Sequence, residues 1–474
     1  MNNDFEKTLQ DTSEVGYVRK LLHSVCFVEG LPNAHLNELV MFENGAKGLV
    51  FSLTVEYCEI LLLSSKAILV GERVARTGKY IQIGLGDYLF GATIDPLGEI
   101  IGKPKAIEIE AYRAIDQQPQ GMIGRKSVNE SLSTGVKMVD ILVPLGKGQR
   151  ELVIGDRKTG KTLFLLQTML NQVRQGTICI YAAVGKQQQD INALHDFIDS
   201  QGIRESVIVV ATGAAEPPGK VFLAPYTAMT IAEYYRDKGK DSLVIMDDLN
   251  AHAKYYREIS LEAKRFPGRS SYPGDIFYTH ARLMERAGNF EKAAITCLPV
   301  AESIMGDLSG YIQTNIMSMT DGHIYFDIER FNDGQRPAVD PFLSVTRVGL
   351  QAQSPLVRQV NRHLTSFLVS LEKMKDFMHF GAEMSDQVRD TLSRGEQLMV
   401  LFNQDYREVV PMNITVYLIG LLWADKYKGL SADATDQEFT KAIQEYQSNE
   451  DYRKKIDGII MSTPDFNELI SKLQ

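Results

Sequence analysis

The sequence has few cysteines and no hydrophobic run long enough to cross a membrane. Its 4 cysteines stand far apart without C-x-x-C spacing, which excludes a disulfide framework and a compact zinc motif. We expect them to be small buried hydrophobic residues in a protein of the reducing cytosol: Cys26, Cys58, Cys179 and Cys297. The longest uncharged apolar run, 416–424, is too short for a transmembrane helix, and residues 1–14 lack the apolar core of a signal peptide. The chain itself is therefore predicted not to be a membrane protein.

A net positive charge is also missing. The chain has 60 acidic and 51 basic residues, which gives a formal charge of -9. Nucleic acids and anionic lipids attract basic surfaces, so we expect no nucleic-acid partner and only local recognition of phosphate. A hydrophobic share of 44% with 23% charged residues is ordinary for a globular protein.

One stretch of eight residues carries most of the functional information. It reads Gly-Asp-Arg-Lys-Thr-Gly-Lys-Thr and matches the pattern of a phosphate-binding loop. An apolar strand at 152–154 precedes it and an apolar helix at 163–170 follows it, as the pattern requires. The predicted nucleotide-binding residues are Gly155, Asp156, Arg157, Lys158, Thr159, Gly160, Lys161 and Thr162.

Each residue type in this loop has a chemical reason. Glycines let successive backbone N–H groups turn toward phosphates, Lys161 reaches the β and γ phosphates, and Thr162 coordinates Mg²⁺. The alternative is a plain surface turn, but it does not explain why Lys-Thr opens an apolar helix whose N-terminus favours phosphate. We therefore predict a site for ATP or ADP with Mg²⁺.

A second motif follows downstream. Residues 242–248 read Ser-Leu-Val-Ile-Met-Asp-Asp, an apolar strand that ends in paired acids. After a phosphate-binding loop, such a strand predicts that Asp247 holds Mg²⁺ through water. The alternative is an ordinary solvated strand end.

Length and periodicity predict a multidomain α/β protein, because 474 residues exceed the size of one hydrophobic core. We assign a short N-terminal segment to 1–16, an antiparallel β-barrel to 17–83, a P-loop nucleotide-binding domain with a parallel α/β core to 84–353, and a helical domain to 354–474.

Local patterns place several elements within these domains. Parallel strands are predicted at 178–184, 207–211 and 243–246. Helices are predicted at 356–380 and 384–402, and a last helix is predicted to be capped by Thr463 and to start at Pro464.

Several longer stretches resemble the α subunits of F-type ATP synthases over nearly the whole chain. They are Val-Pro-Leu-Gly-Lys-Gly-Gln-Arg-Glu at 143–151, Phe-Pro-Gly-Arg at 266–269, Tyr-Pro-Gly-Asp-Ile-Phe-Tyr at 272–278, Gly-Asp-Leu-Ser-Gly-Tyr at 306–311, Thr-Asp-Gly at 320–322 and Leu-Ser-Val-Thr-Arg-Val-Gly at 343–349. The resemblance implies a barrel crown, a central nucleotide domain and a helical domain around a rotating shaft.

The resemblance also implies partners and a location. We expect a catalytic β-type subunit in an alternating α₃β₃ hexamer and a γ-type central shaft. We also expect the chain to lie peripherally at the cytoplasmic face of a membrane. It would contact that membrane only through the ion-translocating sector of the complex. Residues 377–386 resemble the loop that faces the shaft. The segment ahead of the barrel is shorter than in most members, so the attachment of a stator subunit stays open.

Some roles are implied only by matching positions. Arg347 corresponds to an arginine finger that reaches the neighbouring β subunit's site, where a guanidinium stabilises charge on the transferring phosphoryl group. The alternative for Arg347 is a surface salt bridge. Arg336, Pro337 and Gln404 match positions around the adenine.

Lys186 departs from the family pattern. Catalytic β subunits carry a glutamate after the glycine that ends this strand, and α subunits carry a glutamine. A protonated lysine cannot accept a proton from water. Two interpretations stay open: Lys186 helps to hold the triphosphate, or it is an exposed lysine in a polar run.

These observations predict a non-catalytic, nucleotide-binding α-type subunit of a rotary ATP synthase or ATPase. Two alternatives stay open: an α-like subunit of a specialised motor or ion pump, and a self-sufficient homohexameric ATPase of the export or helicase type. The second alternative needs a base in its own site, where this chain has Lys186.

Overall fold

The computed structural model describes residues 3–102, 106–379 and 386–474, and the chain divides into two compact units. The first unit comprises Met1–Lys126, Gly176–Glu302 and Leu308–Thr320. The second comprises Ser127–Gln175, Ser303–Asp307 and Asp321–Gln474. Each unit is therefore built from segments that are distant in sequence, and the predicted domain boundaries stay predictions.

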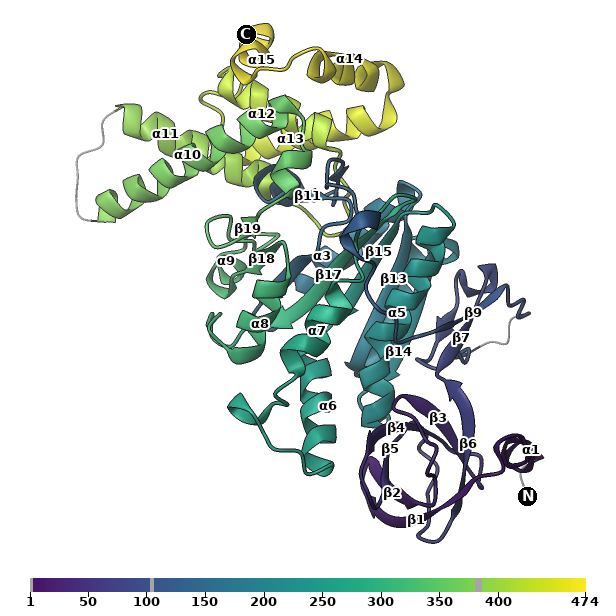
Figure 1. Cartoon of the computed structure of the whole chain (residues 1–474). Coiled ribbons are helices and arrows are strands. Elements are labelled where there is room, and N and C mark those ends of the chain that lie inside the picture. The colour runs from purple at the N-terminus through teal and green to yellow at the C-terminus, as the bar shows by residue number, and fades with distance from the viewer. Residues whose placement is uncertain (1–2, 103–105, 380–385) are drawn as a thin grey trace. The chain divides into compact units, whose positions relative to one another are not determined.

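The first unit begins with a closed antiparallel barrel, the ring of strands drawn in purple and dark blue in Figure 1. Its strands follow the order β1-β2-β5-β4-β3-β6 around the ring. They are β1 (Val15–Leu22), β2 (Val25–Glu29), β3 (Glu38–Phe42), β4 (Lys47–Leu53), β5 (Cys58–Leu62) and β6 (Arg73–Tyr80). β-branched side chains at alternate positions fill the barrel, including Val18, Val28, Val40 and Val74, all fully buried. The predicted barrel is confirmed.

A short helix precedes the barrel, although the sequence analysis assigned none there. Helix α1 (Asn3–Thr12) buries Phe5 to 1% exposure. The guanidinium of Arg73 lies 5.1 Å from the centre of the Phe5 ring and also pairs with Glu6 at 2.8 Å. One aromatic anchor and one ion pair thus hold a helix in which Leu9 is the other apolar residue.

The rest of the first unit contains a parallel sheet in the order β17-β15-β13-β14-β8. Its strands are β8 (Thr93–Ile94), β13 (Ile178–Lys186), β14 (Val207–Gly213), β15 (Ser242–Asp247) and β17 (Ala294–Glu302). β16 (Gly288–Asn289) pairs antiparallel with β17, and β7 (Gln82–Leu85) pairs with β9 (Ala111–Ala114). The helices are α4 (Gln188–Ser200), α5 (Pro218–Asp237), α6 (Leu249–Glu262), α7 (Ile276–Met284) and α8 (Tyr311–Met319). The three parallel strands expected from the sequence are confirmed.

The cysteines behave as their apolar surroundings predicted. All four are free and buried, and they lie on β2, β5, β13 and β17.

The second unit carries a parallel strand pair with a third strand at its edge. β12 (Glu151–Gly155) pairs parallel with β18 (Gly322–Phe326), and β19 (Val345–Thr346) pairs antiparallel with β18. β10 (Ser131–Leu132) pairs with β11 (Leu145–Gly146), and α2 (Lys137–Leu142) lies between them in the chain. Helix α3 (Lys161–Arg174) follows β12, and α9 (Ile328–Asn332) follows β18.

The C-terminal part of the second unit is helical, shown in green and yellow in Figure 1. It consists of α10 (Pro355–His379), α11 (Asp386–Phe402), α12 (Met412–Trp423), α13 (Ala432–Ser448), α14 (Glu450–Met461) and α15 (Phe466–Leu473). Fully buried apolar side chains from successive helices form its core, among them Leu398, Leu401, Ile414, Ile419 and Leu469. The predicted architecture of barrel, α/β region and helical region is confirmed.

The predicted start of the last helix is wrong. Asp465, not Thr463, caps α15, because its carboxylate accepts the backbone N–H groups of Asn467 and Glu468. The Thr463 hydroxyl instead donates to the Ile459 carbonyl at 2.7 Å and so completes the end of α14. Pro464 lies between the two helices.

Two features of the helical region bear on membranes and partners. No described helix is long and apolar enough to cross a bilayer. The loop expected to face a central shaft includes 380–385, which lie outside the described residues.

A buried ion pair in the first unit ties α5 to the chain after α7. Arg286 is 1% exposed, and its guanidinium donates to both carboxylate oxygens of Glu233 at 3.0 and 2.8 Å. It also donates to the Ile115 carbonyl and the Thr230 hydroxyl. A guanidinium without water needs all of these acceptors.

Replacement Glu233→Gln should therefore destabilise the first unit by about 3–5 kcal/mol, because it leaves a buried guanidinium without its counter-charge. Pulse proteolysis across a urea series measures the change. The control is Glu29→Gln, which breaks the exposed Arg19–Glu29 pair and should cost about 1 kcal/mol or less. Equal effects of the two variants would contradict the role given to Glu233.

Candidate nucleotide-binding site

The predicted phosphate-binding loop connects β12 to α3 in the second unit. A Cβ atom at Gly155 would collide with the carbonyl oxygen of Phe326, so only glycine allows this close approach of two strands. Gly160 has a φ of 95° and lies directly before α3, a conformation that glycine adopts without strain. Arg157 and Lys158 are exposed at the outside of the turn.

Side chains of the loop hold its shape. The Asp156 carboxylate accepts the Ser303 hydroxyl at 2.6 Å and the backbone N–H of Gly306 at 3.0 Å. The Thr159 hydroxyl donates to the Asp156 carbonyl at 2.8 Å. The loop is thus fixed by groups that do not need to contact a phosphate.

The candidates for phosphate binding at the start of α3 are Lys161 and Thr162, and they differ in exposure and in hydrogen-bond partners. Lys161 is 9% exposed, and its ammonium donates to the carbonyls of Gly155 and Asp156 at 2.7 and 2.6 Å. Thr162 is exposed, and its hydroxyl has no hydrogen-bond partner in the described part of the chain. A cation, a free hydroxyl and the N-terminus of a 14-residue helix form the donor set expected for a triphosphate.

The second motif lies in the first unit, at the ends of β15 and β13. These strands pair in parallel, with Asp247 opposite Ala183. The Lys186 ammonium lies 2.7 Å from one Asp247 carboxylate oxygen, and the Tyr181 hydroxyl donates to the other at 2.6 Å. Lys186 also lies 3.5 Å from the Asp248 carboxylate. Lys186 therefore bridges both acids of the motif.

This geometry shifts the pKa values of Lys186, Tyr181 and Asp248. Burial acts against the charge of Lys186, but Asp247 and Asp248 outweigh it and raise the lysine pKa. Burial also raises the pKa of Tyr181 well above its usual value, and the Asp247 carboxylate adds to the rise. Burial raises the pKa of Asp248, and Lys186 opposes that rise. The ammonium of Lys186 is thus the internal counter-charge of two carboxylates.

This arrangement differs from the interpretation of Lys186 as an exposed lysine, whereas its role toward a triphosphate stays a prediction. The Lys186 side chain is only 21% exposed, which does not fit an exposed lysine in a polar run. Its ammonium is bonded to Asp247, the residue expected to hold Mg²⁺ through water. Both Asp247 oxygens therefore already have a partner, and a metal held through water at Asp247 would share the carboxylate with Lys186 and Tyr181.

The structure brings Arg336 and Gln404 together in the second unit. The Gln404 backbone N–H donates to the Arg336 carbonyl at 2.8 Å, and the Arg336 N–H donates to the Asn403 side chain at 3.0 Å. The Gln404 amide is buried, accepting from the Lys137 N–H at 2.9 Å and donating to the Gly135 carbonyl at 2.7 Å. Contact of these residues and of Pro337 with an adenine stays a prediction.

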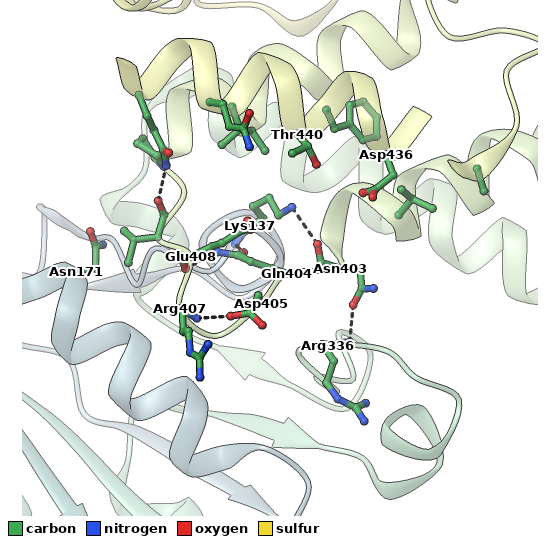
Figure 2. Close-up of a pocket in the computed structure, with 18 of the residues that line it drawn as sticks. Lys137, Asn171, Arg336, Asn403, Gln404, Asp405, Arg407, Glu408, Asp436 and Thr440 are labelled. Carbon is green, nitrogen blue, oxygen red and sulfur yellow. Dashed lines mark hydrogen bonds between the residues drawn. The ribbon is translucent and has the colours of Figure 1, made fainter. Parts of the chain in front are cut away.

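Arg336 and Gln404 both line a cavity of about 1250 Å³, shown in Figure 2. Lys137 is 5% exposed and points across this cavity, where its ammonium donates to the Asn403 carbonyl at 3.0 Å. The cavity also meets Asn171 and Arg174, at the end of α3 away from the phosphate-binding loop.

Burial lowers the pKa of Lys137 to about 8, while the charges of Glu408 and Asp436 partly oppose the shift. We therefore expect acetylation of Lys137 by acetic anhydride to rise with pH around a midpoint near 8, because only the neutral amine reacts. Mass spectrometry of digests after short exposures between pH 7 and 10.5 measures it.

The matched variant for this experiment is Asp436→Asn. It removes a charge that raises the pKa, so the midpoint for Lys137 should move to lower pH. A labelling curve for Lys137 that still rises steeply above pH 10 would contradict the assignment.

Arg347 lies just after β19 and is exposed. Its backbone N–H donates to the Asp321 carbonyl at 3.1 Å, while its guanidinium forms no hydrogen bond or ion pair within the described residues. Burial raises the pKa of the nearby Glu151 well above its usual value, and Arg347 opposes this rise. The surface salt bridge considered as an alternative for Arg347 is therefore not formed in the described part of the chain.

Sequence reasoning missed several of these partners. Tyr181 lies in an apolar strand, and only the pairing of β13 with β15 shows that it reaches Asp247. Ser303 and Gly306 hold Asp156, and Gly306 opens one of the stretches that carried the resemblance. Lys137 carried no signal, because a lysine near an apolar helix usually lies on the surface.

Comparisons with known proteins agree with this geometry. Residues 135–346 match the nucleotide-binding domain of the ATP synthase alpha/beta family, and residues 353–472 match the C-terminal domain of ATP synthase alpha/beta chains. The chain is 40% identical to the ATP synthase subunit alpha of Sulfurovum sp. (strain NBC37-1) over 414 residues, which cover 86% of this chain and 82% of the relative. It is 37% identical to the ATP synthase subunit alpha of Acholeplasma laidlawii (strain PG-8A) over 458 residues, which cover 92% of this chain and 91% of the relative.

Proposed function

The chain belongs to the ATP synthase alpha/beta family, and we propose that it is a nucleotide-binding, non-catalytic α-type subunit of a rotary ATPase hexamer. The observation that carries the non-catalytic part is the contact between Lys186 and Asp247 at 2.7 Å. A subunit that hydrolyses ATP needs a base or a water-orienting group at the end of this strand. An ammonium bonded to a carboxylate cannot accept a proton.

The phosphate-binding loop supports retention of the nucleotide. Lys161 would exchange its two carbonyl contacts for phosphate oxygens, and the N–H groups at the start of α3 would donate to the same anion. Bound ATP or ADP supplies the triphosphate or diphosphate that these groups recognise. Asp156, held by Ser303, keeps the loop in place for that contact.

Replacement Lys161→Ala should abolish binding of ATP to the purified chain, because a partly buried polyphosphate would then lack its cation. Isothermal titration calorimetry measures the affinity. Lys441→Ala, which removes an exposed lysine on α13, is the matched control and should bind as the parent chain does. Unchanged affinity in the Lys161 variant would show that the loop does not bind phosphate.

The proposed assembly follows from the family. We propose an alternating hexamer with a catalytic β-type subunit, around a γ-type shaft, which works as part of an ion-translocating ATP synthase or ATPase. The chain would sit peripherally at the cytoplasmic face of a membrane and contact it only through the ion-translocating sector. A stator contact is left open by the proposal.

Within that assembly, Arg347 would act on the neighbouring β-type subunit. Its support is an exposed guanidinium with no ion-pair partner among the described residues, next to a short strand that fixes its backbone. Such an arginine stabilises negative charge on the transferring phosphoryl group.

We expect Arg347→Ala to lower ATP turnover of the assembled hexamer by about 10³- to 10⁵-fold, since the finger acts only in the transition state. The affinity of this chain for ATP should stay unchanged. Phosphate release from the complex, purified from its own cells, measures turnover. Arg19→Ala, at a barrel position where the side chain is 56% exposed, is the control and should keep the parent rate.

Two outcomes of this experiment would contradict the proposal. Full turnover in the Arg347 variant would exclude a finger at this position. Sustained hydrolysis by the purified chain alone, lost on Asp190→Asn, would favour a self-sufficient homohexameric ATPase, because Asp190 is the nearby acid that could replace the missing base.

A further inference from the structure

Glu151, at the start of β12, is a buried acid close to the strand that precedes Arg347. It is 0% exposed and pairs with Gly322 of β18, which pairs in turn with Thr346 of β19. β18 and β19 are labelled in Figure 1. One carboxyl oxygen of Glu151, Oε2, accepts the Gln149 side-chain N–H at 2.6 Å. The other, Oε1, is also buried and accepts no hydrogen bond from the described residues. Such an oxygen in a folded interior needs an explanation.

Three oxygen atoms converge on the space above Gly322. A Cβ atom there would lie 2.1 Å from the Val345 carbonyl oxygen, 2.7 Å from Glu151 Oε2 and 2.8 Å from Glu151 Oε1. The space is too small for a methyl group, and therefore too small for a water molecule that could donate to Oε1. The second amide hydrogen of Gln149 is directed to the Thr346 hydroxyl at 3.4 Å. The oxygens therefore lack a donor unless a proton lies among them.

A protonated carboxyl resolves this shortage. An ionised Glu151 would hold its negative charge against a carbonyl oxygen in a site without water. A proton on Oε1 removes that repulsion and lets Glu151 donate toward the Val345 carbonyl. Burial raises the pKa of Glu151 well above its usual value, and the charge of Asp321 adds to the rise. The hydrogen bond from Gln149 and the charge of Arg347 oppose it.

The charged groups around Glu151 do not neutralise it directly. Arg150, its neighbour in the chain, pairs with the Asp321 carboxylate at 2.7 Å. His323, the next residue along β18, donates through Nε2 to a backbone carbonyl at 2.8 Å. The guanidinium of Arg347 forms no ion pair in the part of the chain that the structure describes. A proton is therefore the remaining way to balance the buried carboxyl.

We propose that Glu151 is a positioning residue, whose protonated carboxyl bridges β12 to the Val345 carbonyl and so fixes the backbone from which Arg347 extends. The proposal rests on the arginine finger proposed above and adds the group that holds it. β19 comprises only two residues, so its place depends on such cross-links, among them the bond from the Thr346 hydroxyl to the Pro144 carbonyl at 2.9 Å. A group that meets a reacting phosphoryl must be held to within about 0.5 Å.

The first experiment follows hydrogen exchange of the peptide 343–349 in the full chain by mass spectrometry, between about pH 5 and 9, in the parent and in Glu151→Gln. This peptide has the same sequence in both chains, so intrinsic exchange rates cancel in the ratio. Opening of β19 in the parent releases a carboxyl of ordinary pKa, so protection that is present at low pH is lost as pH rises. A glutamine can donate to Val345 at every pH.

We therefore expect similar exchange of the two chains near pH 5. As pH rises, exchange in the parent should exceed that in Glu151→Gln by up to about tenfold more for each pH unit. The matched control is Glu438→Gln, the same change at an exposed position on α13, which should exchange as the parent does. A ratio between Glu151→Gln and the parent that stays constant with pH, or faster exchange in this variant at every pH, would overturn the protonated bridge.

The second experiment tests whether Glu151 acts through Arg347 in the assembled hexamer. Glu151→Gln should keep turnover within about twofold of the parent, whereas Glu151→Ala should lower kcat by about tenfold or more with KM unchanged. In an Arg347→Ala background, Glu151→Ala should cause no further loss, because a positioning residue acts only through the group that it positions. A further tenfold loss in the double variant would overturn the positioning role.

The two experiments separate this inference from the proposed function. If Arg347→Ala keeps full turnover, the proposed finger fails, while the exchange ratio still decides whether a protonated Glu151 holds β19. If the ratio is constant with pH and Arg347→Ala is inactive, the inference about Glu151 fails and the finger stands. If Glu151→Ala does not assemble, the exchange of Glu151→Gln decides alone.

Discussion

A charge that leaves water must be met by an opposite charge or by hydrogen-bond partners within the protein, and this constraint shapes the interior of both units. In the first unit, Glu233 meets the buried Arg286, and Lys186 meets Asp247 and Asp248. In the second, backbone carbonyls meet the ammonium of Lys161. The first of these contacts holds elements together, whereas the carbonyls around Lys161 can be exchanged for an anion. The ammonium of Lys161 contacts two backbone carbonyls, whereas that of Lys186 lies between two carboxylates.

Much of the fold could be predicted because its signals are local. Alternating β-branched residues define the barrel, apolar runs define the strands β13, β14 and β15, and helical periodicity defines the C-terminal part. The misses have local causes as well. One buried aromatic residue, Phe5, anchors α1 in a polar stretch where periodicity gives no signal. At α15, Thr463 and Asp465 are both good capping residues, and only the hydrogen bonds show that Asp465 caps the helix.

In the candidate site, too, the local features could be predicted from the sequence and the long-range contacts could not. The loop between β12 and α3 could be predicted because its motif consists of eight consecutive residues, while its contacts with phosphate stay a prediction. The partners of Asp247 could not, since Tyr181 and Lys186 are separated from it by 66 and 61 residues and meet it only through strand pairing. The sequence did mark Lys186 as unusual, but charge and position alone could not show whether it faces a phosphate, the solvent or an acid.

The contact between Lys186 and Asp247 supports the proposed non-catalytic role, because an ammonium lies at the strand end where a catalytic subunit needs a base. Hydrolysis needs a group that accepts a proton from water and a metal that neutralises charge as it develops on the phosphates. The ammonium of Lys186, bonded to Asp247, accepts no proton and so does not meet the first of these requirements. The proposed binding of nucleotide depends on the loop and the start of α3, which provide N–H donors and a cation. Under the proposed function, Lys186 would lower turnover while the residues of the predicted phosphate-binding loop stay in place.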